Sequence, residues 1–295
     1  MAGIDINRTT SGISLPAQVS SEIWGKTLEQ SAVMQLARKV TLPGSGLSIP
    51  VITGEPTADW VAETDEKPVS RSTFGQKTMT PYKLAVIEPF SNEFRRDLPS
   101  LYAELVRRLP YALGRKFDST VFTGTAPGSG FDVLSSAPAK TLDGTGTLAD
   151  LIAINSSVAA NGGVNTGWAL SPQGEAVALG AADTTGRPLF ISDLQREGSV
   201  GSLLGRPVYL SQAVYAADAD GAGAGTAPLL GFAGDWGNAM YGTVEGVQVA
   251  ISDQATLNDG GTSLNLWQRN MFAVRAEIEI GFVVRDVNQY VKITG

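Results

Sequence analysis

SNEFRRDLPSLYAELVRRLPYALGRKFDSTVFTG, residues 91–124, carries the strongest helical pattern in the chain. Its apolar residues recur at steps of three and four positions, at Leu98, Leu101, Leu105, Leu109, Leu113, Phe117 and Val121. This spacing places them on one face of a long helix, and that face must pack against other parts of the fold. Asp97 and Pro99 are typical of a helix start, and Gly124 is typical of a helix end.

Two features of this helix need an interpretation. Pro110 lies inside the apolar pattern and lacks a backbone donor, so we expect a kink or a cost of about 3 kcal/mol. The second feature is a basic row, which is either a phosphate-binding row or a solvated face of the helix: Arg107, Arg108, Arg115 and Lys116. The solvated face is favoured, because charges on a helix mostly face water.

A long polar stretch precedes the helix and separates two strand-like segments, residues 47–52 and 83–90. Its sizeable apolar residues are few, namely Trp60, Val61, Val69, Phe74 and Met79. A two-stranded excursion with so little apolar surface is marginally stable alone. Long loops without structure are also uncommon inside compact domains. We therefore predict a hairpin arm that rests on a neighbouring subunit.

The remaining segments alternate between short helices and short strands. Residues 16–40 have a broken helical spacing, and Gly25 favours two short helices there. Further helices are expected at 147–163 and 172–183. Strands are expected at 167–171, 188–192, 207–210, 229–233, 239–242 and 247–252. Polar and apolar residues alternate from Ala273 to Ile280, which predicts a long strand with one buried face.

Composition excludes several classes of function. The 295 residues include no His and no Cys, which removes the Ser-His-Asp and Cys-His nucleophiles and the usual zinc ligands. The net charge is 22 − 29 = −7, which does not favour wrapping nucleic acid. No leader and no apolar stretch of about 20 residues is evident, so we expect a soluble chain without a membrane partner. We predict no cofactor and no metal.

Gly-Arg-Pro occurs twice, at Gly186-Arg187-Pro188 and at Gly205-Arg206-Pro207. The two arginines either bind an anion jointly or belong to two separate turns that each lead into a strand. The turns are favoured, because glycine relieves a turn, proline fixes the extended backbone after it, and no glycine-rich phosphate loop lies nearby.

The order of these pieces resembles a known family. The helix above is followed by GWALSP, TTGRPLF, LLGRPVYLS, LLGFAGDWGNAMYG and NMFAVRAEIEIGFVVRDVNQYVKIT. From about Leu15 onward, this series is similar to the major capsid proteins of tailed phages, which have the Hong Kong 97-type fold. The resemblance implies an α+β fold with an N-terminal arm (1–41), an E-loop hairpin (42–84), a P-domain (85–140 and 262–295) and an A-domain (141–261).

The resemblance also implies a function. Such subunits assemble into pentamers and hexamers that close into an icosahedral head around double-stranded DNA, which they enclose without specific binding. The protein would then be structural, would reside in the virion after assembly in the host cytoplasm, and would not be an enzyme. Two alternatives remain open here: an encapsulin-type nanocompartment shell of the same fold, and a carboxylate-dependent enzyme.

Particular residues take roles from the resemblance. Trp60, Lys67, Pro68 and Phe74 would contact a neighbouring subunit through the E-loop. Both Gly-Arg-Pro turns would shape the assembly surface of the A-domain around the capsomer axis. The family's type member joins its subunits by a lysine–asparagine isopeptide bond, and its motifs match Lys67 before Pro68, Asn270 before Met271, and Glu277 as the proton acceptor.

The resemblance also implies partners for this protein. The type member carries a long N-terminal scaffolding segment, whereas only some fifteen residues precede the region of resemblance here. We therefore expect a separate scaffolding protein, together with a portal, and leave decoration proteins open.

Overall fold

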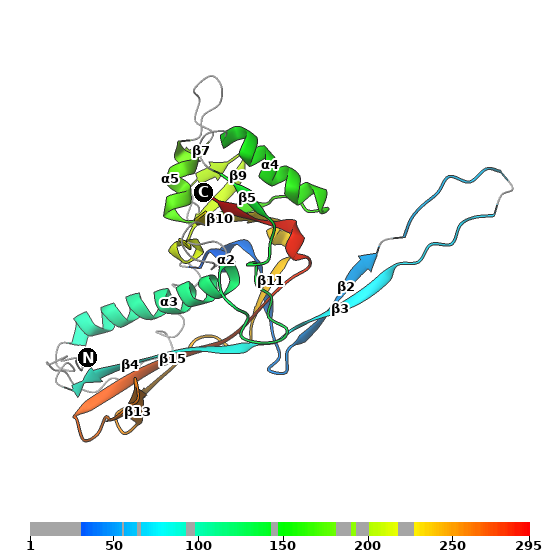
Figure 1. Cartoon of the computed structure of the whole chain (residues 1–295). Helices are drawn as coiled ribbons and strands as arrows, with labels where there is room; N and C mark the ends of the chain where they lie inside the picture. The colour runs from blue at the N-terminus through cyan, green and yellow to red at the C-terminus, as the bar shows by residue number, and fades with distance from the viewer. Residues whose placement is uncertain are drawn as a thin grey trace.

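The computed structural model describes residues 31–54, 56–63, 66–92, 98–142, 147–180, 190–192, 201–217 and 227–295. It has a mixed α+β fold with two main sheets and a long arm that projects from the body (Figure 1). Among the residues described, no helix is both long and apolar enough to cross a membrane.

The predicted long helix is present as α3 (Leu98–Phe122) and continues through Pro110. Leu109 and Leu113 are buried in one apolar cluster with Phe272 and Ile278 of the strand β15 (Met271–Val284). Further along the helix, Phe117 and Val121 join the largest cluster of the protein. The described part of the apolar stripe, from Leu109 to Val121, is therefore buried, as its spacing predicts.

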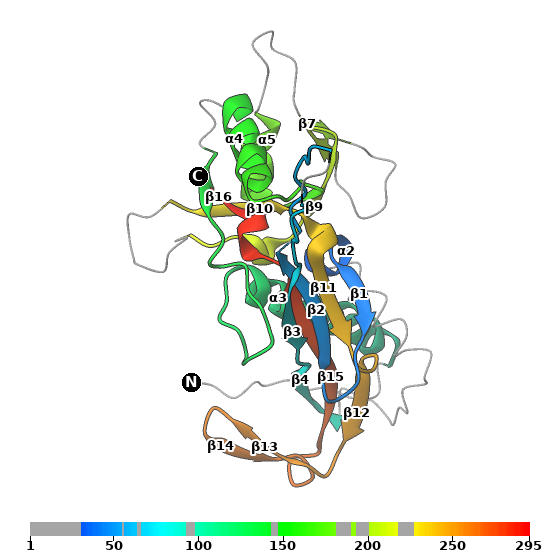
Figure 2. The same cartoon turned by 90° about the vertical axis from the view of Figure 1, so that its right-hand side faces the viewer.

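That sheet has five strands and is built around β15, the predicted closing strand. On one side β15 pairs with β4 (Tyr82–Ser91), and on the other with β12 (Gln248–Ser252) and β11 (Ala239–Thr243). Figure 2 shows the strands side by side. The fifth strand, β1 (Arg38–Thr41), runs parallel to β11.

The prediction that residues 38–40 belong to a helical region is wrong. Only α2 (Ala32–Leu36) is helical within the described part of residues 16–40, and residues 38–41 form β1. The pairing of β1 with β11 supplies backbone hydrogen bonds that outweigh a weak helical pattern. The other helix expected here lies outside the described residues.

The second sheet has seven strands in the order β5-β16-β10-β6-β9-β8-β7. Their bounds are Ala139–Thr141, Tyr290–Thr294, Leu229–Gly234, Gly167–Leu170, Arg206–Leu210, Gly201–Leu203 and Phe190–Ser192. The helices α4 (Thr147–Ala160) and α5 (Pro172–Leu179) lie beside it (Figure 1). Leu151 and Ile154 of α4 and Trp168 of β6 are fully buried in this region.

Shorter elements complete the described chain. Three 3-10 turns, η2 (Gln212–Val214), η3 (Trp236–Asn238) and η4 (Val287–Gln289), connect strands. A separate hairpin of β13 (Thr256–Asp259) and β14 (Thr262–Asn265) projects beyond the five-stranded sheet (Figure 2).

The arm is a hairpin, as predicted, but its second strand is different. β2 (Leu47–Gly54) pairs with β3 (Thr73–Met79), whereas the segment 83–90 lies in β4 and belongs to the five-stranded sheet. β4 turns Leu84 and Val86 toward the cluster under α3, so its apolar residues are used in the body. β3 is largely polar and is held by backbone pairing with β2.

Candidate assembly surfaces

The arm presents large apolar side chains to solvent. Trp60 is 105% exposed, Val69 84% and Phe74 73%. Lys67 and Pro68 lie on the same exposed stretch. Within the arm, the backbone N–H of Thr57 donates to the Ser70 hydroxyl at 2.8 Å, which ties the two sides of the loop together. The described part of this chain leaves Trp60 and Phe74 largely uncovered, so the arm carries apolar surface suited to another molecule.

The base of the arm is tied to the body at several points. The Lys77 Nζ donates to the Asp132 carboxylate at 2.8 Å and to the Val284 carbonyl at 2.7 Å. The Val284 N–H in turn donates to the same Asp132 oxygen at 3.0 Å. These three residues come from β3, from the loop after α3 and from the end of β15, so they join three separate segments. We call this group the arm-base clamp.

A second set of bonds extends the attachment. The Thr80 N–H donates to the Gly130 carbonyl at 2.9 Å, and the Tyr82 hydroxyl donates to the Ser129 carbonyl at 2.7 Å. Gly130 has a φ of +77°, and a Cβ there would lie 2.8 Å from the Thr78 carbonyl oxygen. The close approach of loop and arm therefore requires glycine.

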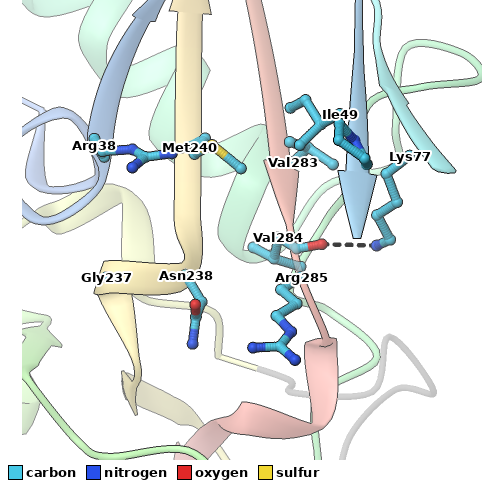
Figure 3. Close-up of a pocket in the computed structure, with 10 residues that line it drawn as sticks. Arg38, Ile49, Lys77, Gly237, Asn238, Met240, Val283, Val284 and Arg285 are labelled. Atoms are coloured by element: carbon cyan, nitrogen blue, oxygen red, sulfur yellow. Dashed lines mark hydrogen bonds between the residues drawn. The ribbon is translucent and has the colours of Figure 1, made fainter. Parts of the chain in front are cut away.

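A cavity of about 360 Å³ lies beside the clamp (Figure 3). Its apolar wall contains Ile49, Met240 and Val283, and its cationic groups are Arg38, Lys77 and Arg285. The Arg38 guanidinium lies 3.0 Å from the Met240 sulfur. We call this site the basic pocket. Sequence reasoning missed it, because its residues come from segments far apart in the chain.

The three residues of the expected cross-link are apart within one chain. Lys67 lies on the arm, whereas Asn270 immediately precedes β15 with a φ of +55°. The Asn92 side chain donates to the Asn270 side-chain oxygen at 3.1 Å. Glu277 lies seven positions further along an extended strand, about 20 Å away at roughly 3.3 Å per residue. It accepts from the Arg275 guanidinium at 3.4 Å.

The two Gly-Arg-Pro motifs differ in what the structure describes. Gly186-Arg187-Pro188 lies outside the described residues. In the second motif, Gly205 (φ +74°) follows Leu204 (φ +50°) in a two-residue turn, and Arg206 and Pro207 begin β9. This is a hairpin turn with both central residues in the left-handed region.

The basic row on α3 is exposed at Arg108, Arg115 and Lys116, while the side chain of Arg107 lies outside the described part. The Arg115 guanidinium lies 6.0 Å from the centre of the Tyr111 ring. This arrangement agrees with a solvated helix face.

One buried acid escaped sequence reasoning. Asp118 of α3 is fully buried and accepts from the Ser31 hydroxyl at 2.6 Å, the Ser211 hydroxyl at 2.8 Å and the Ala32 N–H at 2.9 Å. Burial raises the pKa of its carboxyl to about 6. The sequence offers no signal for it, because its partners lie far along the chain. Its role in this structure is to join α3, α2 and the segment before η2.

Comparison with known proteins gives the family. Residues 11–295 match the phage capsid family. The chain is 32% identical to the probable major capsid protein gp17 of Mycobacterium phage L5, over 95% of this chain and 89% of that protein. It is 31% identical to the corresponding gp17 of Mycobacterium phage D29, over the same shares of both chains. A solved chain of Mycobacterium phage Adephagia superposes with a TM-score of 0.68 at 20% identity, over 90% of each chain.

The chain therefore belongs to the phage capsid family, a family of structural proteins. It is a major capsid protein, the shell-forming protein of a tailed-phage head, as the sequence predicted. This result favours the predicted capsid over both alternatives, the nanocompartment shell and the carboxylate-dependent enzyme.

Proposed function

We propose that the hairpin arm is the element that joins neighbouring subunits into the pentamers and hexamers of an icosahedral head. The observation that carries this proposal is the exposure of Trp60, Val69 and Phe74 on an arm that points away from its own body (Figure 1). Burial of such a side chain contributes about 1.5–3 kcal/mol each, so three of them supply a substantial contact. A neighbouring copy of the chain is the natural cover in a shell.

The subdomains of the Hong Kong 97-type fold are assigned accordingly. The arm serves as the E-loop, and α3 with the five-stranded sheet serves as the P-domain. The seven-stranded sheet with α4 and α5 serves as the A-domain, whose turns, including Gly205-Arg206-Pro207, lie around the capsomer axis. This assignment differs from the expected ranges, because β11 and β12, expected in the A-domain (141–261), belong to the five-stranded sheet, and β16, expected in the P-domain (262–295), belongs to the seven-stranded sheet. Contacts between unlike surfaces of identical subunits close into rings when the rotation between them permits it, which is the geometry that a capsomer needs.

The net charge of −7 supports enclosure of DNA without specific binding, since a wall of this sign does not neutralise phosphates. Assembly would take place in the host cytoplasm with a separate scaffolding protein and a portal, with decoration proteins as further candidates.

A covalent bond between subunits is a second proposal. The Lys67 amine, once deprotonated, attacks the side-chain carbonyl carbon of Asn270, an amide bond forms, and ammonia leaves. A Glu277 carboxylate accepts the lysine proton and returns it to the departing nitrogen. Because one chain holds Asn270 and Glu277 about 20 Å apart on a strand, at roughly 3.3 Å per residue, the three groups would come from different copies.

The arm proposal is tested by removing its apolar side chains. The triple variant Trp60→Ser, Val69→Ser and Phe74→Ser should unfold at about the wild-type temperature, because these side chains are largely exposed in their own subunit. It should sediment as single subunits and show no particles in negative stain. Ala62→Ser with Ser72→Thr on the same arm is the matched control and should form particles. Normal particle yield from the triple variant would contradict the proposal.

A further inference from the structure

We propose that the basic pocket receives the arm tip of a second copy of this chain, with Trp60 inserted against the apolar wall. The inference rests on the proposed function, because it names the place where the arm docks. It depends on the match between two surfaces that are both present on every subunit, the pocket at the base of the arm and the side chains at its tip.

The pocket has the chemistry of a site for an apolar side chain flanked by acids. Ile49, Met240 and Val283 line it, and Arg38, Lys77 and Arg285 supply positive charge around them (Figure 3). The carboxylate of Asp132 offsets Lys77, so the cationic groups still outnumber the acids among these residues. A volume of about 360 Å³ is within the range of sites that bind compact ligands.

The arm tip has the complementary chemistry. Residues 55–66 contain five acidic residues and no basic one. Asp59 and Glu63 flank Trp60 in the described part of the tip, and all three are exposed. An indole with a carboxylate on either side fits an apolar wall with cations around it, because the indole contacts apolar side chains and each carboxylate faces a cation.

A subunit is unable to fill its own pocket in this way. The pocket lies where the arm leaves the body, whereas the tip is at the far end of an extended hairpin (Figure 1). From Leu47 to Glu63 the backbone spans about 50 Å at roughly 3.3 Å per residue. The tip of one copy therefore meets the base of the next. Such a head-to-tail contact, repeated around an axis, closes a ring.

The segment of residues 1–30 from a neighbouring copy is the rival occupant. It also contains a tryptophan, Trp24, but its three acids and two basic residues nearly balance. The arm tip carries the stronger negative charge and is the better match to the cationic lining of the pocket.

Disulfide trapping tests the contact directly, because the natural chain contains no cysteine. All cysteine variants are made in a Lys67→Ala background, which removes the proposed isopeptide bond. Particles of the double variant Val61→Cys and Met240→Cys should give a ladder of dimers and larger species on non-reducing gels, and reduction should remove it. A disulfide needs Cβ atoms about 3.5–4.5 Å apart, so only true neighbours react. Each single variant should run as a monomer. The control pair Val61→Cys and Thr262→Cys places the second thiol on β14 and should give no ladder.

Charge reversal gives an independent readout. Arg38→Glu with Arg285→Glu should lower particle yield by about tenfold or more, since acids would then face acids. Adding Asp59→Lys and Glu63→Lys should restore the yield, which a fold defect would not allow. Failure of the added lysines to restore the yield contradicts the inference.

The remaining outcomes separate the two proposals. Normal particles without the Val61–Met240 ladder overturn the docking site and leave the role of the arm intact. A ladder from Trp24→Cys with Met240→Cys, in place of the arm ladder, overturns it in favour of the rival segment. If the triple serine variant of the arm still assembles, the proposed function fails and the docking site fails with it.

Discussion

At the scale of single residues, Asp118 shows how a buried charge organises a fold. Two hydroxyls and two backbone N–H groups point at its carboxylate, and all four are donors. Such an environment suits the ionised acid, yet complete burial outweighs it and raises the pKa to about 6. Among the described residues, Asp118 is therefore the carboxyl whose titration contributes most clearly to the pH dependence of stability.

The direction of that dependence follows from the pKa values. The pKa of the carboxyl rises from 3.8 to about 6 on folding, so the folded state holds its proton more tightly. The contribution of this carboxyl to the free energy of unfolding is fully present below about pH 4 and is lost as the pH rises through about 6. The effect is about 3 kcal/mol. Urea unfolding of unassembled subunits between pH 4 and pH 7 should show this loss. Asp118→Asn should flatten the profile, whereas Asp253→Asn at an exposed site should not. Equal slopes in both variants would exclude Asp118 as the source.

Gly130 provides a second residue-scale prediction. Gly130 and Gly162 both have positive φ, +77° and +73°, but only Gly130 has neighbours within 4 Å of a built Cβ. Alanine at either position carries the left-handed cost of about 1–2 kcal/mol. Gly130→Ala should be destabilising by about 1 kcal/mol more than Gly162→Ala, because its methyl group would collide with Thr78 and Thr80. Denaturant unfolding measures the difference in the free energy of unfolding. Equal losses in the two variants would show that the loop shifts to accommodate the Gly130→Ala methyl group without cost.

At the scale of elements, the arm-base clamp sets the direction of β2 and β3. Lys77→Met keeps the aliphatic stem and removes both polar contacts, to Asp132 and to the Val284 carbonyl. We expect faster amide hydrogen exchange across β3, because the hairpin base then opens more often. Lys83→Met is the matched control, since Lys83 pairs with Glu279 on an exposed surface. If both variants exchange alike, the clamp does not hold the arm.

The sequence predicted the elements whose side chains repeat regularly and missed those held by backbone pairing. α3 and β15 follow clear apolar patterns, and both were found. β3 reads TFGQKTM, with no alternation of apolar residues, so nothing indicated a strand there. β1 overlaps the end of the segment whose spacing predicts helix, because a four-residue strand has too few positions to show its period.

Of the assembly surfaces, the exposed arm is indicated by the sequence, whereas the basic pocket is not. The exposure of Trp60 and Phe74 follows from a stretch with too little apolar surface to make a core, so composition alone indicated it. The basic pocket was beyond sequence reasoning, because Arg38, Lys77 and Arg285 meet only after three strands are brought together. The bonds of Asp118 to Ser31 and Ser211 depend on folding in the same manner.

At the scale of the whole molecule, the subunit buries its own cores but leaves large apolar side chains exposed on its surface. Both sheets have buried cores, while the large exposed apolar groups include Trp60 on the arm and Trp267 near the start of β15. Trp60 lies on the arm and Trp267 between β14 and β15, and the arm and the β13–β14 hairpin extend from the body in different directions (Figure 1). Such a distribution is expected of a protein that folds first and is then covered by its neighbours.

The covalent proposal belongs to this scale. Mature particles, denatured and run on a gel, should give a ladder of cross-linked species, and Lys67→Ala should reduce it to a single monomer band. Arg71→Ala removes another positive charge from the arm without removing the nucleophile, so its ladder should persist. A single monomer band from wild-type particles would rule the bond out.

The way the arm enters the body has a mechanical consequence. Only Thr80 and Pro81 separate β3 from β4, and the two strands run on in nearly one line (Figure 1). A pull on the arm is therefore delivered lengthwise to β4, which faces β15 over ten residue pairs. A lengthwise force loads all those bonds together in shear, whereas a sideways force would peel them apart one by one. When a shell is strained outward, the force on each subunit would then act along β4, the direction in which its hydrogen bonds to β15 resist separation best.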